Sequence, residues 1–91
     1  MTHAVVLIEA ERDALSSLGG ALADIEGVGE AYSVTGEWDF VAIVRVPHHE
    51  QLADVVTAQI GALPGVVKTQ TMVAFVAYSR HDLEALFSVG E

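Results

Sequence analysis

The stretch Ser33–Phe40, with the sequence SVTGEWDF, holds the residues best suited to bind a small ligand. Gly36 can adopt the positive φ that a tight turn needs, and such a turn presents backbone N–H groups able to hold a carboxylate. Asp39, just after the turn, can accept hydrogen bonds from an ammonium group. Two plainer interpretations stay open, in which Asp39 bonds the amides of its own turn and Trp38 fills the core or an interface.

A second candidate site follows about thirty residues later in the sequence Thr69-Gln70-Thr71. Side chains alternate along a strand, so Thr69 and Thr71 are expected on one face and Gln70 on the other. Two hydroxyls on one face can line a small polar pocket. Threonine is also simply a good strand residue, and that alternative stays open as well.

The other polar clusters do not predict catalysis. His48, His49 and Glu50 are adjacent at a predicted strand-to-helix corner, so they point in different directions, and no cysteine or spaced histidine completes a zinc set. They are typical of a solvated helix N-terminus. His81 and Asp82 fit a capped helix start. With no serine-nucleophile motif and no phosphate-binding loop, we expect no catalytic residues, no metal and no cofactor.

The composition is apolar and acidic. Hydrophobic residues make up 52% of the 91 residues and charged residues only 19%, which is more apolar surface than a small domain readily hides. The net charge is −9 with four Lys and Arg in all, so there is no basic patch for nucleic acid or an anionic membrane. There is no cysteine, and no apolar run approaches the ~20 residues that span a bilayer. We expect a cytoplasmic protein.

The predicted elements alternate in a regular order. Strands are expected over residues 4–8, 28–35, 38–46 and 66–78, and amphipathic helices over 15–25 and 52–63. The Gly19-Gly20 pair is expected where the first helix crosses close over the sheet, and Gly27 is expected to end that helical segment. The form S-x-x-D at Ser79 predicts a further short C-terminal helix over residues 81–89.

The two halves of the chain resemble each other. IEGVGEAYSVT, which starts at Ile25, aligns with LPGVVKTQTMV, which starts at Leu63. Each is the end of a helix, a Gly-Val corner and a strand, which suggests a duplicated βαβ unit. The sequence therefore predicts an α+β, ferredoxin-like βαββαβ domain over residues 1–91, with a four-stranded antiparallel sheet and two helices on one face.

The strand patterns predict an uncovered apolar face. Residues 5–8, 41–44 and 72–77 are runs of apolar residues rather than alternating ones. Because both helices lie on one side, the other side of the sheet needs a cover, and pairing with a second copy through the sheet faces is the simplest one.

At this point the sequence resembles a family. VTGEWDF, followed about thirty residues later by LPGVVKTQTMV, is similar to the effector-binding domain of Lrp/AsnC-type regulators over roughly residues 4–78. The resemblance implies dimers that pair through their sheets, rings of dimers, and an amino acid or related effector held at dimer–dimer contacts. It also implies ligand contacts at Val34, Thr35, Gly36, Trp38 and Asp39 on the turn, at Thr69, Gln70 and Thr71 on the strand, and at His49 in the pocket wall.

One departure from the family pattern affects the expected partners. Full-length members carry an N-terminal helix-turn-helix domain, whereas here the first strand begins almost at once, which resembles a stand-alone sensor form. Such a form is expected to join a full-length regulator in mixed assemblies or to serve another ligand-dependent role. The alternatives are a small dimeric α+β barrel enzyme and a purely structural oligomerisation module.

Overall fold

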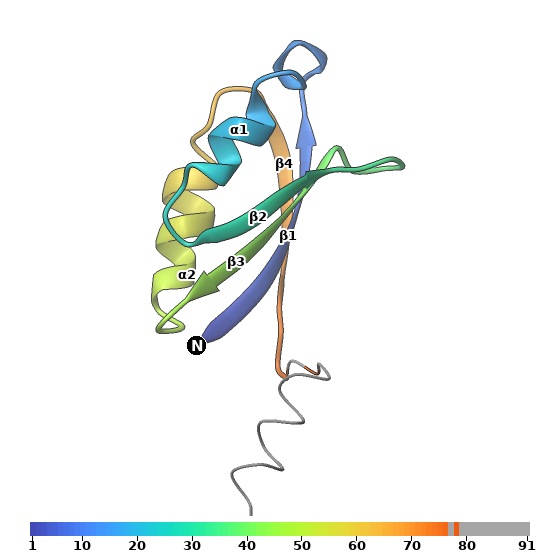
Figure 1. The fold of residues 1–91 in the computed structure, drawn as a ribbon. Coiled ribbons are helices and arrows are strands. Elements are labelled where there is room, and N and C mark those ends of the chain that lie inside the picture. The colour runs from blue at the N-terminus through green and yellow to red at the C-terminus, as the bar shows by residue number, and fades with distance from the viewer. Residues whose placement is uncertain (77, 79–91) are drawn as a thin grey trace, which may run out of the picture.

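Four antiparallel strands form one sheet in the computed structural model, which describes residues 1–76 and 78. The strand order is β2-β3-β1-β4, with β1 at Thr2–Ala10, β2 at Val28–Ser33, β3 at Phe40–Val46 and β4 at Val66–Val73. The helical segments are η1 at Arg12–Ala14, α1 at Leu18–Ala23, and α2 at Gln51–Ala53, which continues directly as η2 at Asp54–Ile60. Figure 1 shows α1 and α2 on the same side of the sheet, which confirms the predicted ferredoxin-like arrangement.

The core fills the space between the sheet and the helices. Alternate residues of β1 and β3 point toward the helices and are at most 3% exposed: Ala4, Val6, Ile8, Phe40, Ala42, Val44 and Val46. Leu18 and Leu22 of α1 and Leu52, Val55 and Ile60 of α2 and η2 cover them. In the described part of the chain, no helix is long and apolar enough to cross a membrane.

The first helix is shorter than the predicted 15–25. Arg12–Ala14 makes a single 3₁₀ turn, α1 begins only at Leu18, and Leu15 is 44% exposed although its spacing placed it on the buried face. The Ser17 hydroxyl donates to the Ala14 carbonyl at 3.4 Å, which is the local competition that disfavours serine inside helices. Two successive glycines raise the cost of helix formation further.

The glycine pair has two different environments. A Cβ on Gly19 would lie 3.3 Å from Cε1 of Phe40, so α1 does approach the sheet closely at this residue, as predicted. A Cβ on Gly20 would meet nothing within 4 Å. Only the first glycine is therefore explained by close approach.

The second helix buries its predicted face but winds more widely than predicted. Over Asp54–Ile60 the backbone is π-helical, and it closes with Gly61 N–H donating to the Val56 carbonyl at 2.9 Å. A Cβ on Gly61 would lie 2.9 Å from the Thr57 carbonyl oxygen, so glycine permits this wide closing turn. The Gln59 amide also donates to Asp54 Oδ2, five residues earlier, at 3.1 Å.

The internal repeat appears in the structure as two equivalent corners. Gly27 and Gly65 occupy matching positions and have φ of 103° and 93°. In each corner the following valine N–H donates to a residue three earlier, from Val28 to Ile25 at 3.0 Å and from Val66 to Leu63 at 3.2 Å. The predicted helix-to-strand corners are confirmed, and both require the positive φ that glycine adopts readily.

The last strand stops earlier than predicted. β4 ends at Val73 rather than at residue 78, although the residues that follow are still strand-forming types. Ala74 N–H still donates to the His3 carbonyl at 2.9 Å, and the backbone then bends at Phe75, which ends the pairing with β1. The predicted helix over 81–89 lies outside the described residues.

The side of the sheet away from the helices is apolar at its centre. Val5 and Leu7 of β1 and Val41 and Ile43 of β3 are half-buried there, beside Tyr32, 53% exposed, and Met72, 45% exposed. We call these six residues the open face. An ion pair at its edge joins Arg45 to Glu30 at 2.8 Å. The prediction that both sheet sides are apolar is confirmed.

Candidate functional site

The glycine turn joins β2 to β3 and is longer than the predicted two-residue connection. Val34 N–H donates to the Asp39 carbonyl at 3.0 Å and closes the loop. Gly36 has a φ of 108°, which confirms the positive value predicted for it. Val34, Thr35 and Gly36 are exposed, and a Cβ on Gly36 would meet nothing within 4 Å. The turn therefore presents backbone to open space, and Gly36 is required by its φ rather than by crowding.

Asp39 ties this turn to the end of β1. Its Oδ2 accepts a hydrogen bond from Ala10 N–H at 2.7 Å, and its own N–H donates to the Ile8 carbonyl at 2.9 Å. Ala10 lies at an irregularity in the β1–β4 register, where an amide would otherwise lack a partner. The carboxylate thus bonds a neighbouring strand rather than its own turn. A carboxylate accepts several hydrogen bonds, so this contact leaves capacity for a ligand.

Trp38 connects the turn with the other candidate strand. The Lys68 ammonium lies 5.6 Å from the centroid of its half-buried ring, a cation–π contact that reaches from β4 across β1. Lys68 immediately precedes Thr69. The structure therefore places the predicted Trp38 contact near the beginning of the predicted threonine strand.

The β4 residues alternate as predicted. Thr69 pairs with Ile8 and Thr71 with Val6, both of which point to the helix side, whereas Gln70 pairs with Leu7 on the open side. Thr69 is half-buried, while Gln70 and Thr71 are exposed.

An open pocket of about 330 Å³ lies between α2, η2 and β4. It brings Thr71 together with His49, the residue predicted for a pocket wall, and its other lining residues are Glu50, Leu52, Ala53, Val56, Thr57 and Val73. We call it the helix–strand pocket. Apolar side chains combine there with a few polar groups, as in many small-molecule sites. Sequence reasoning missed Thr57 and Ala53, which stand at helical spacing beside the residues of the buried face.

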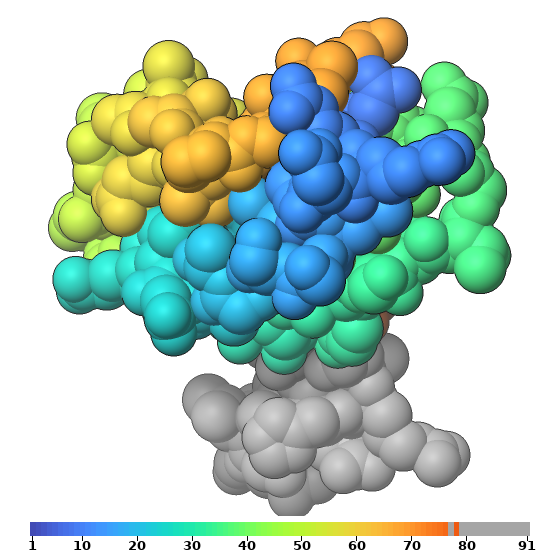
Figure 2. Space-filling view, turned by 90° about the horizontal axis from the view of Figure 1, so that it is seen from above, coloured from blue at the N-terminus to red at the C-terminus, as the bar shows by residue number. Residues whose placement is uncertain are grey.

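The turn residues do not reach this pocket within one chain, because none of Val34, Thr35, Gly36, Trp38 and Asp39 lines it. In Figure 2 the green turn and the yellow α2–η2 segment lie on opposite sides of the molecule. Of the predicted ligand contacts, only His49 and Thr71 line the helix–strand pocket. The turn residues form a separate group, and Thr69 and Gln70 belong to neither.

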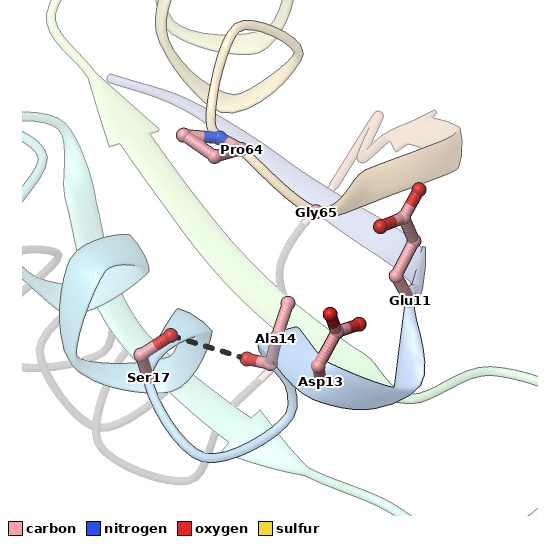
Figure 3. Close-up of a pocket in the computed structure, with 6 residues that line it drawn as sticks. All are labelled: Glu11, Asp13, Ala14, Ser17, Pro64 and Gly65. Carbon is pink, nitrogen blue, oxygen red and sulfur yellow. Dashed lines mark hydrogen bonds between the residues drawn. The ribbon is translucent and has the colours of Figure 1, made fainter.

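Two further pockets lie at the equivalent glycine corners. One, of about 260 Å³, is lined by Glu11, Asp13, Ala14, Ser17, Pro64 and Gly65 and is drawn in Figure 3. The other, of about 230 Å³, is lined by residues that include Gly27, Val55 and Arg45. Neither contains a predicted ligand contact. Among the described residues, no three His, Asp or Glu side chains are grouped so as to hold a metal ion.

Comparisons with known proteins agree with this geometry. The family model of the Lrp/AsnC ligand binding domain matches residues 3–83. An uncharacterized HTH-type transcriptional regulator of Pyrococcus furiosus is 36% identical over 78 residues, which are 82% of this chain and 52% of that protein. The chain thus spans about half the length of the curated relatives it matches.

Solved structures show the same fold. TTHA0845 from Thermus thermophilus is 48% identical, with a TM-score of 0.83 over 88% of this chain and 100% of that one. A feast or famine regulatory protein of M. tuberculosis, solved in complex with L-methionine, is 28% identical, with a TM-score of 0.70 over 88% of this chain and 54% of that one. The matched span, the glycine turn and the threonine strand lead to one conclusion: the chain belongs to the Lrp/AsnC ligand-binding domain family.

Proposed function

We propose that this chain is a regulatory effector-binding module that holds an amino-acid-type molecule and carries out no catalysis. The helix–strand pocket carries this proposal, because it joins Thr71 and His49 to an apolar lining. Leu52, Val56 and Val73 suit an apolar side chain, while the hydroxyl and the imidazole suit polar groups of the same ligand. The methionine bound by the related M. tuberculosis protein supports this class of ligand.

Self-association is part of the proposed function. Among the residues that the structure describes, no Lys or Arg lines the helix–strand pocket, so a ligand's carboxylate finds no cationic partner there. The exposed turn around Gly36 offers backbone N–H groups of the kind that bind carboxylates, but it lies on the far side of its own chain. We propose that a neighbouring copy brings its turn to the pocket, and that copies also pair through their open faces.

The charges of the described residues favour regulation through protein contacts rather than direct DNA binding. Arg45 is paired with Glu30 at 2.8 Å, and Lys68 lies over Trp38 at 5.6 Å. With a net charge of −9, these engaged cations form no patch for phosphates. We propose that another regulator chain of the same family is the partner through which ligand binding takes effect.

Calorimetric titration of the protein with L-methionine, and then with the other amino acids, tests the proposal. Thr71→Val keeps the side-chain shape and removes the hydroxyl, so we expect about tenfold weaker binding of the ligand found. Thr69→Val is the matched comparison, because Thr69 lies on the same face of β4 but does not line the helix–strand pocket.

A change of less than about threefold is expected for Thr69→Val. If Thr71→Val and the unmodified protein bind the ligand with equal affinity, the ligand does not bind in this pocket. No binding of any amino acid at millimolar concentration, with the native particle intact, would contradict the sensing function itself and favour a purely structural module.

A further inference from the structure

Among its described lining residues, the helix–strand pocket contains a single carboxylate, that of Glu50. The other side chains there are aliphatic groups, two hydroxyls and the imidazole of His49. Leu52 on α2 is 6% exposed, and Val73 on β4 is 43% exposed. A carboxylate beside such apolar surface is screened less by water than one on an open surface, so it interacts more strongly with a charged group that enters.

Glu50 has no ion-pair partner within the described part of the chain. It is the N-cap residue of α2, where a side chain commonly accepts a hydrogen bond from the helix's own N–H groups, yet its side chain makes no capping hydrogen bond. The ion pair that the structure shows joins Arg45 to Glu30. The Glu50 carboxylate therefore keeps its capacity for a group of a bound ligand.

The charge of this lining favours one kind of ligand over another. An ammonium group carries the charge opposite to that of Glu50 and donates hydrogen bonds, so it can bond the carboxylate directly. A ligand with a carboxylate and no cationic group is repelled by Glu50, and no Lys or Arg among the described lining residues offsets that repulsion. The net charge of −9 on the chain adds to the repulsion.

We propose that Glu50 binds the α-ammonium group of an amino acid with an apolar side chain and thereby excludes the α-keto acid with the same side chain. This role of Glu50 rests on the proposed effector function and names the chemical group that the site recognises. The two ligands share their carboxylate and their apolar side chain. Leu52, Val56 and Val73 suit both equally, so Glu50 is the residue that distinguishes them.

Recognition through the ammonium group determines what the module reports. Loss of the amino group from an apolar amino acid leaves its α-keto acid, which has the same carbon skeleton and a net negative charge. Glu50 attracts the first and repels the second. The module therefore responds to the amino acid itself and not to its deaminated product.

Calorimetric titration of the full chain with L-methionine, L-leucine and their two α-keto acids tests this role. We expect each amino acid to bind at least about thirtyfold more tightly than its keto acid. Glu50→Gln keeps the side-chain shape and removes the charge, so this preference is expected to fall at least about tenfold. Glu26→Gln removes the same charge from an exposed residue outside the helix–strand pocket, and is expected to change the preference less than about threefold.

Three results would overturn the role of Glu50 and leave the effector function in place. They are equal binding of an amino acid and its keto acid, an unchanged preference in Glu50→Gln, and an equal loss of preference in Glu26→Gln, which would assign the effect to net charge. Binding of other amino acids without binding of L-methionine or L-leucine would also overturn it. If no amino acid binds at all, both this role and the proposed function are contradicted.

Discussion

The two sides of the sheet are built from the same strands and the same kinds of residue, yet they differ in what covers them. Ala42 and Ile8, on the side of the helices, are fully buried, whereas their neighbours Ile43 and Leu7 on the open face are only half-buried. The helices therefore complete one side within the chain, and the other side has no cover among the described residues. We therefore expect the stability of the single chain and its proposed assembly to depend on separate sets of residues.

The largest contrast is expected from an aspartate introduced at two successive positions of β3. Ala42→Asp buries an unpaired charge under the helices and is expected to cost about 3–5 kcal/mol or more, so the chain should fail to fold. Ile43→Asp places the same charge on the open face. It should leave the fold intact and break the assembly into smaller particles. Circular dichroism and sedimentation distinguish these results.

Ala58→Asp is the control for the added charge, because Ala58 is exposed on η2, on the opposite side of the sheet from the open face. It is expected to change neither the fold nor the particle mass. Dissociation by Ala58→Asp to the same extent as by Ile43→Asp would mean that net charge, and not the open face, controls assembly.

A smaller contrast is expected from truncations in β1. Ile8→Ala empties space in a fully buried site and should lower the free energy of unfolding by about 2–5 kcal/mol. Leu7→Ala should lower it by less at low protein concentration, where the open face is uncovered, and should weaken association at high concentration. Urea unfolding at two protein concentrations measures both effects. The comparison fails if Leu7→Ala and Ile8→Ala cost the same at low concentration.

The smallest effect is expected at the two glycines of α1, which show how tightly the helix side is packed. Gly20→Ala enters open space and should stabilise the protein by roughly 0.5–1 kcal/mol. Gly19→Ala places its Cβ 3.3 Å from Cε1 of Phe40, so part or all of that gain should be lost. Thermal unfolding of the two variants side by side provides the measurement, and an equal gain from both would show that α1 is not held close to the sheet.

Much of the fold follows from local features of the sequence. The repeat of Gly27 and Gly65 identified both helix-to-strand corners, and the apolar runs identified the strands and the uncovered sheet side. Features that depend on distant neighbours did not follow. The strand β4 ends at Val73 because the backbone bends at Phe75, and the wide winding of η2 is permitted by Gly61. The periodicity of the sequence shows neither feature.

Local features of the candidate region could be predicted from the sequence, but the arrangement of its parts could not. The positive φ of Gly36 and the alternation of Thr69, Gln70 and Thr71 follow from local chemistry. The hydrogen bond that Ala10 N–H donates to Asp39 Oδ2 does not, because the two residues are 29 positions apart in the chain and meet only in the folded sheet. Nor does the separation of the turn from the helix–strand pocket, which only the three-dimensional arrangement shows.

The mass of the native particle tests the need for a second copy most directly. The chain has a mass of 9.6 kDa, and the uncovered side of its sheet predicts a well-defined multiple of that value at micromolar concentration. Sedimentation equilibrium or light scattering gives the value without any substitution. A single species of 9.6 kDa that persists to millimolar concentration would show that the open face is stable in water, and would contradict the account.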